Sequence, residues 1–100
     1  MRQVVDVAEA VEGAEVLYTD TWISMGQESE AAERRKIFAG YKIDSALMKK
    51  AADGVIAMHC LPAVRGEEID VDVMHGSSSA IWDQAENRLH AQKALLRFLS

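Results

Sequence analysis

The chain has 100 residues and a formal net charge of −5, so it is long enough for one small domain and not for two. Its Lys and Arg residues are scattered and form no basic stripe, which argues against nucleic-acid binding. No apolar run approaches the roughly 20 residues that cross a bilayer, and the first residues lack the apolar core of a signal peptide. The single cysteine excludes an internal disulfide and fits a reducing compartment, so we expect a cytoplasmic protein with no membrane partner.

Capping residues and glycines delimit the helices predicted in the first half of the chain. The suitable N-caps are Asp6, Ser29 and Asp44, and the glycines that follow are Gly13, Gly40 and Gly54. The predicted helices are therefore Val7–Glu12, Glu30–Ala39 and Ser45–Ala52. Ala14–Thr19 is apolar enough to be a buried strand, and Trp22–Glu28 is predicted to be a loop.

The second half begins with another apolar run and ends with the clearest helix. Val55–Met58 is predicted to be a buried strand, Glu67–Met74 a short helix and Ala80–Trp82 a short strand. The last helix, Asp83–Leu99, has one narrow polar stripe and is apolar over most of the remaining circumference. Such a helix is buried on more than one side, so we expect it to pack on the sheet and on a further surface such as a second domain.

Helices and strands that alternate along a chain are typical of a parallel sheet. The fold class is therefore predicted to be α/β, a partial doubly wound parallel sheet flanked by helices, or Rossmann-like half domain. Only two or three strands are expected, four if Gln3–Val5 is one. That number is small for a free-standing doubly wound domain, so the chain is interpreted as part of a larger α/β protein.

Both predicted strands end at side chains that can carry chemistry. Asp20 follows the first strand, and His59-Cys60-Leu61-Pro62 follows the second. Ligands of open α/β sheets bind beyond the carboxyl ends of the strands, so these groups are expected to converge on one cleft.

Each of these residues also has an ordinary structural interpretation. Free cysteines such as Cys60 are usually small buried hydrophobes, and a lone His59 is often structural. Asp20 after a strand commonly caps a turn. Arg88 falls within the apolar arc of the last helix, where an arginine needs an acidic partner or an anionic ligand. The three histidines and Cys60 lack the spacing of a zinc site, so no metal is expected.

Three motifs together resemble the ornithine carbamoyltransferases. Asp20-Thr21-Trp22-Ile23-Ser24-Met25-Gly26 resembles the ornithine-binding loop of that family, His59-Cys60-Leu61-Pro62 its His-Cys-Leu-Pro signature, and Ala85-Glu86-Asn87-Arg88 its final motif. The order and separation of the motifs also agree with the family. The Ser-Met-Gly loop favours ornithine over the aspartate-using and putrescine-using relatives.

The resemblance implies transfer of the carbamoyl group of carbamoyl phosphate to the δ-amine of L-ornithine, in arginine biosynthesis, with no cofactor. It implies that ornithine contacts Asp20, Ser24, Met25, Cys60 and Leu61. It implies that carbamoyl phosphate contacts His59, Cys60, Leu61 and Arg88, with His59 and Arg88 polarising the carbamoyl oxygen. The catalytic residues would be Cys60, Asp20, His59 and Arg88, and full-length members of the family are trimers.

The resemblance covers nearly the whole chain but only about the last third of a family member. The Ser-Thr-Arg-Thr-Arg phosphate loop and the His-Pro-x-Gln motif of the family do not occur here. Residues 1–100 are therefore interpreted as the C-terminal part of the ornithine-binding domain, with the carbamoyl-phosphate domain absent and negligible turnover. The alternatives are a non-catalytic excised or engineered α/β folding module that self-associates, and a stand-alone ornithine-binding module.

Overall fold

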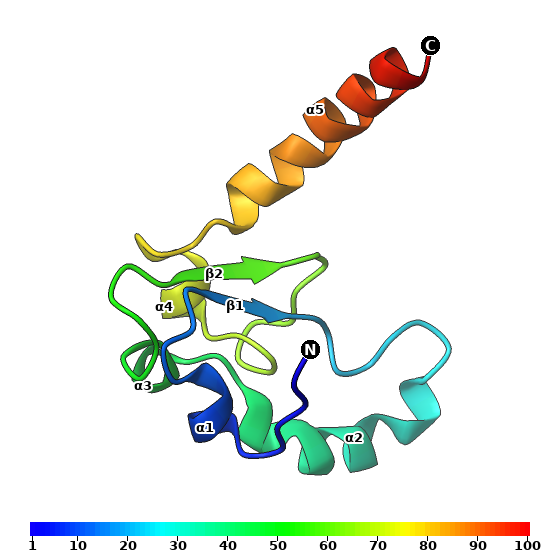
Figure 1. Cartoon of the computed structure of the whole chain (residues 1–100). Coiled ribbons are helices and arrows are strands. Elements are labelled where there is room, and N and C mark those ends of the chain that lie inside the picture. The colour runs from blue at the N-terminus through cyan, green and yellow to red at the C-terminus, as the bar shows by residue number, and fades with distance from the viewer.

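The computed structural model describes all residues, 1–100, and has the mixed α/β character that the sequence predicts. The α-helices are α1 (Val7–Val11), α2 (Ala31–Phe38), α3 (Ser45–Met48), α4 (Val71–Met74) and α5 (Ile81–Leu99). The strands are β1 (Val16–Thr19) and β2 (Ile56–His59), and the 3₁₀ turns are η1 (Glu28–Glu30) and η2 (Ala39–Tyr41). In Figure 1, α1, α2 and α3 lie on one side of the strands, and α5 rises from the other. None of the helices is both long and apolar enough to cross a membrane.

The two strands form a parallel pair, which confirms the predicted fold class. Val16 lies opposite Ile56 at one end of the pair, and Thr19 lies opposite His59 at the other. This register brings the carboxyl ends of both strands to the same edge. The segments after them, which begin at Asp20 and Cys60, therefore start side by side.

A small apolar core holds the helices to the sheet. Its buried members are Val11, Leu17, Ile43, Val55, Ala57, Ile69, Val73, Met74 and Ile81. Leu47, Met48 and Ala51 pack against this core. Ala57 also donates its N–H to the Ser78 carbonyl and accepts from Ala80 N–H, which ties the start of α5 to β2.

Two of the predicted N-caps are confirmed by their hydrogen bonds. The Asp6 carboxylate accepts from Glu9 N–H at 3.0 Å, and the Asp44 carboxylate accepts from Leu47 N–H at 2.8 Å. Each bond satisfies a backbone donor that the helix itself leaves free. These local interactions explain why α1 and α3 start where the sequence predicts.

Other predicted boundaries are wrong. Ser29 does not cap α2, because the chain already turns as η1 before that helix, and Gly40 lies inside η2 instead of ending the helix. The predicted helix Ser45–Ala52 is shorter, ending at Met48, and the predicted helix Glu67–Met74 is confined to α4. Ala80–Trp82 is no strand, since α5 starts at Ile81, and Gln3–Val5 forms no strand either.

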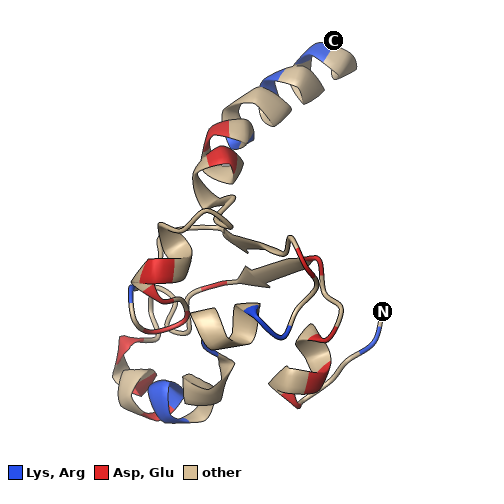
Figure 2. Ribbon diagram, turned by 90° about the vertical axis from the view of Figure 1, so that its left-hand side faces the viewer, with Lys and Arg blue, Asp and Glu red and all other residues tan.

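The last helix, α5, projects from the body of the molecule (Figures 1 and 2). Ile81 is its only buried residue, whereas Leu96 is 70% exposed and Phe98 is 85% exposed. The expectation that α5 packs along the sheet is therefore wrong for this chain: its first turn meets β2 and the rest extends beyond it. Figure 2 shows acidic residues near the start of α5 and basic ones toward its end, which suits the helix dipole.

Candidate active site at the carboxyl ends of the strands

A pocket of about 270 Å³ lies beyond the carboxyl ends of β1 and β2, where the start of α5 closes one side. Its lining residues are Tyr18, His59, Cys60, Gln84, Ala85 and Arg88. Three elements far apart in sequence thus contribute to one pocket, two of them strands. This placement agrees with the general rule for ligands of open α/β sheets.

Asp20 and Cys60 lie close enough, next to this pocket, for each side chain to shift the pKa of the other. The hydrogen bond from the Cys60 thiol, with that from Thr21 N–H at 2.6 Å, holds the pKa of Asp20 below its ordinary value. Desolvation and the neighbouring Asp20 carboxylate raise the pKa of the Cys60 thiol. The pair is therefore a carboxylate beside a neutral thiol at physiological pH.

Tyr18 and Gln84 are two pocket residues that the sequence analysis missed. The Gln84 amide donates to the Tyr18 hydroxyl at 3.1 Å and accepts from His59 N–H, also at 3.1 Å. The nearby Tyr18 hydroxyl acts to lower the pKa of Cys60, against the larger effects that raise it. Gln84 therefore connects β1, β2 and α5 at the wall of the pocket.

His59 lies at the same strand end, but its ring is fully buried. Its Nε2 is 2.7 Å from the Glu68 carboxylate, and its Nδ1 accepts from Leu61 N–H at 2.8 Å. Both ring nitrogens are thus engaged within the chain. His59 is nevertheless one of the residues that line the pocket.

Arg88 extends from the second turn of α5 into the pocket lining. It is exposed and makes no ion pair within the chain, although the sequence analysis expected an acidic partner or an anionic ligand. Its planar donors are consequently available on the side of the pocket opposite the strands.

The structure does not bring Ser24 and Met25 to this pocket. Both lie in the loop between β1 and η1, and the Met25 side chain is 97% exposed. Leu61 is half-buried and packs against the core beside the pocket. The geometry therefore groups Asp20, Cys60 and Arg88, and leaves the outer part of the ornithine-like loop apart from them. No three His, Cys, Asp or Glu side chains are placed to hold a metal ion.

A parallel strand pair with a pocket at its carboxyl ends is the arrangement in which α/β domains bind their ligands. Residues 1–99 match the family described as aspartate/ornithine carbamoyltransferase, Asp/Orn binding domain, and the chain belongs to this family. The resemblance drawn from the three sequence motifs is therefore confirmed.

Individual relatives agree with this assignment. The chain is 62% identical over 91 residues, 91% of its length, to an ornithine carbamoyltransferase of Methanosphaera stadtmanae, of which the match covers 30%. It is similar to the structure of ornithine carbamoyltransferase from Pyrococcus furiosus, with 57% identity and a TM-score of 0.83 over 91% of this chain and 29% of that one. For the Campylobacter jejuni enzyme the identity is 43% and the TM-score 0.85, over 94% and 31% of the two chains.

The chain thus spans about 30% of the length of the curated relatives that it matches. These comparisons give no support to the alternative of an engineered, non-catalytic folding module.

Proposed function

We propose that this chain carries part of the active site of an ornithine carbamoyltransferase, a cytoplasmic enzyme of arginine biosynthesis. The reaction joins carbamoyl phosphate and L-ornithine into citrulline and phosphate. Membership of the family and the ornithine carbamoyltransferase names of its relatives support this substrate pair. The observation that carries the proposal is the Asp20–Cys60 pair beside a pocket that Arg88 also lines.

In the proposed chemistry the δ-nitrogen of ornithine attacks the carbamoyl carbon with its lone pair. The bond between that carbon and the bridging oxygen breaks, phosphate leaves, and the amine releases a proton. The Asp20 carboxylate attracts the ammonium form of the substrate, and the Cys60 thiol beside it lies where the released proton must pass. No covalent intermediate with the chain is required.

Negative charge develops on the carbamoyl oxygen during this attack. A guanidinium placed next to that oxygen stabilises the charge more in the transition state than in the substrate. Arg88 is the exposed cation of the pocket and takes this role in the proposal. His59 is assigned no direct contact through its ring, because both ring nitrogens are engaged.

The proposed ornithine contacts are Asp20, Ser24, Met25, Cys60 and Leu61, and the proposed carbamoyl phosphate contacts are Cys60, Leu61 and Arg88. For Ser24 and Met25 the proposal requires that the loop after β1 moves toward the pocket when ornithine binds, since both are outside it in this structure. The 100-residue chain alone is expected to be inactive, because it lacks the phosphate loop of the family. In the full-length enzyme a trimer is expected.

A chimera tests this function. The portion of the Methanosphaera stadtmanae enzyme that precedes the matched region is joined to this chain, and citrulline formation is measured from carbamoyl phosphate and ornithine. We expect activity in the chimera and none in the isolated chain. Robust activity of the isolated chain would contradict the predicted inactivity, and a folded but inactive chimera would contradict the proposed reaction.

Two arginine variants of α5 then test the pocket. Arg88→Lys replaces the planar guanidinium by a single ammonium, and we expect kcat of the chimera to fall by about 10²-fold or more. Arg97→Lys makes the same change near the exposed end of the same helix, away from the pocket, and serves as the matched control. Equal effects of the two changes would remove Arg88 from the proposed chemistry.

A further inference from the structure

One apolar and one polar side chain hold the start of α5 to the strands. Ile81 is fully buried, and Gln84 is the only other residue of α5 that is not exposed. The Gln84 amide donates to the Tyr18 hydroxyl at 3.1 Å and accepts from His59 N–H at 3.1 Å. A single side chain of α5 therefore contacts β1 and β2 at once, at the wall of the pocket.

The partner of Gln84 on β2 determines how its amide is oriented. A backbone N–H can only donate, so the Gln84 atom that faces His59 N–H is the amide oxygen. The amide nitrogen then faces Tyr18, and this nitrogen can donate but cannot accept. The Tyr18 oxygen is consequently the acceptor in this contact, and the proton of the Tyr18 hydroxyl is left for another partner.

The Cys60 thiol lies within reach of that hydroxyl. Tyr18 and Cys60 line the same pocket, and the hydroxyl acts to lower the pKa of the thiol. This is the effect of a donor, because a donor stabilises the thiolate form. Asp20 acts in the opposite direction, so the thiol lies between one group that favours its neutral form and one that favours the thiolate.

Attachment of α5 alone does not require an amide at this position. An apolar side chain there would also bury surface against the strands, but it would leave the Tyr18 hydroxyl free to rotate. Tyr18 is 56% exposed, so water would then compete for the hydroxyl proton. The donor nitrogen of Gln84 is thus the feature that gives the hydroxyl a direction.

Gln84 also lies on the face of α5 that carries Arg88. The two residues are four positions apart in the helix and both line the pocket. The contact that occupies the Tyr18 oxygen therefore also restrains rotation of the helix that brings the guanidinium to the pocket.

We infer that Gln84 is a positioning residue that directs the Tyr18 hydroxyl toward Cys60 while it holds the Arg88 face of α5 at the strand ends. This inference deepens the proposed function and rests on it for its catalytic meaning. The effect on the thiol is a property of the 100-residue chain itself, in which Cys60 is the only cysteine and is exposed.

The test measures the pH dependence of Cys60 alkylation by iodoacetamide in the 100-residue chain. The thiolate is the reacting species, so the rate below the midpoint follows the thiolate fraction. Gln84→Glu keeps the size of the side chain and an oxygen for His59 N–H, but a carboxylate cannot donate, so Tyr18 donates to it instead. We expect alkylation at pH 8 to slow by about threefold or more and the midpoint to move to higher pH.

Tyr18→Phe separates this redirection of the hydroxyl from the effect of an added charge. We expect Tyr18→Phe alone to move the midpoint to higher pH, because the hydroxyl is lost. In the Tyr18→Phe background Gln84→Glu adds only its charge, so it should displace the midpoint by at most about half as much as in the wild type. The other ionisable side chains beside the thiol or the pocket are unchanged in all these variants: Asp20, His59 and Arg88.

Gln92→Glu is the matched control. It makes the same chemical change further along α5, at an exposed position outside the pocket, and should leave the alkylation profile unchanged. Circular dichroism establishes that each variant is folded. Where Gln84→Glu is unfolded, Gln84→Met replaces it, because this variant likewise cannot donate to Tyr18.

A folded Gln84 variant with the wild-type midpoint would overturn the inference, and so would an unchanged midpoint in Tyr18→Phe. Equal displacements with and without the Tyr18 hydroxyl, or an equal displacement by Gln92→Glu, would also overturn it, because charge alone would then be the cause. A displacement that depends on Tyr18 and is absent in Gln92→Glu supports it. None of these measurements involves citrulline, so their failure is distinguishable from failure of the chimera.

Discussion

Ile81 is the side chain that attaches α5 to the sheet, and shortening it should be costly. It is fully buried, whereas every other residue of α5 is at least partly exposed. In Ile81→Ala, at about 0.8 kcal/mol per buried methylene, the lost transfer free energy alone is about 2.4 kcal/mol. The residual cavity brings the expected loss of unfolding free energy into the range of about 2–5 kcal/mol.

This loss is large for this chain. A domain of this size has about 5–15 kcal/mol of stability in total. Only 11 of the 100 residues are buried, which places the chain near the lower end. A loss of about 3 kcal/mol corresponds to a decrease in Tm of about 12–24 °C. Ile81→Val, which removes a single methylene, should cost about 0.5–1.5 kcal/mol.

Leu96→Ala is the matched control, because it deletes the same number of carbon atoms from the same helix at a position that is 70% exposed. We expect it to change the unfolding free energy by less than about 0.5 kcal/mol. Urea unfolding followed by circular dichroism at low protein concentration measures all three variants. A Leu96→Ala chain destabilised as much as Ile81→Ala would show that α5 is packed along its length, and the reasoning would fail.

The remaining predictions concern a cap, the thiol pair and association. Asp44→Ala removes the hydrogen bond to Leu47 N–H and should lower the unfolding free energy by about 0.5–2 kcal/mol, measured by the same urea titration. Asp20→Asn removes the carboxylate that helps to raise the pKa of Cys60, so the midpoint of the pH dependence of Cys60 alkylation by iodoacetamide should move to lower pH. An unchanged midpoint would contradict the pairing of Asp20 with Cys60. Folding lowers the pKa of Asp20 from 3.8, so its stabilising effect is lost as the pH falls below that value; folding raises the pKa of Cys60 from 9.0, so its effect is lost as the pH rises above that value. Asp20→Asn should therefore reduce the pH dependence of the unfolding free energy at both ends of the pH range. Finally, light scattering should show that the chain self-associates and that Leu96→Lys reduces the association; a monomer at high concentration would contradict this.

The parts of the fold that sequence predicts well are those that local chemistry determines. Asp6 and Asp44 cap helices because their carboxylates reach backbone donors three residues away. Ser29 has the same local pattern, but a 3₁₀ turn starts before it and removes the extended conformation that a cap requires. Ala80–Trp82 is predicted to be a strand because it is a short apolar run. Ile81 is buried in the core as the first residue of a helix, and a short apolar run does not distinguish a buried strand from the buried start of a helix.

In the candidate site, too, the sequence predicts some residues, and only the structure shows the others. Asp20 and Cys60 directly follow strands, so a parallel sheet brings them together and the sequence suffices to predict their proximity. Gln84 and Glu68 are single polar residues within otherwise ordinary segments. Only the tertiary structure shows that Gln84 connects the strand ends and that Glu68 contacts the His59 ring and Val64 N–H. His59 is the reverse case: its motif predicts a ligand contact, but neighbours in space engage both ring nitrogens.

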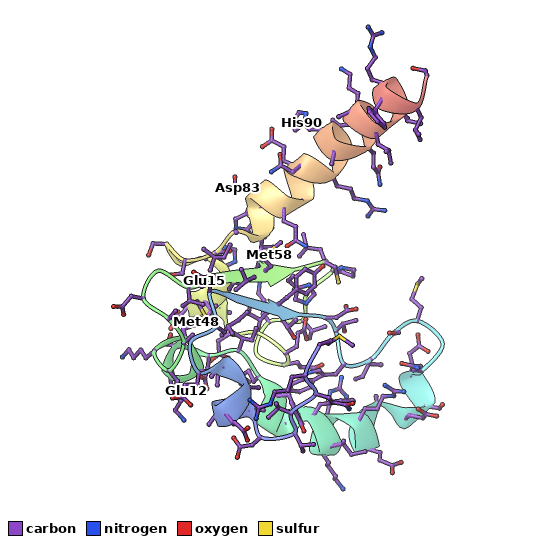
Figure 3. The ribbon with its side chains drawn as sticks, in the orientation of Figure 1. Glu12, Glu15, Met48, Met58, Asp83 and His90 are labelled. Atoms are coloured by element: carbon purple, nitrogen blue, oxygen red, sulfur yellow. The ribbon has the colours of Figure 1, made fainter.

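The helix α5 shows what an apolar pattern does and does not specify. At 1.5 Å per residue its 19 residues extend about 28 Å, and only the first turn lies against β2. Figure 3 shows side chains such as that of His90 standing clear of the body. The pattern correctly predicts the helix, because periodicity is a property of the segment itself. The same apolar pattern predicts that a surface covers the helix, but a molecule with a two-stranded sheet is too small to cover all of α5. The exposed leucines therefore leave α5 with an uncovered apolar surface, and they give it the strongest tendency of any element here to bind a second surface.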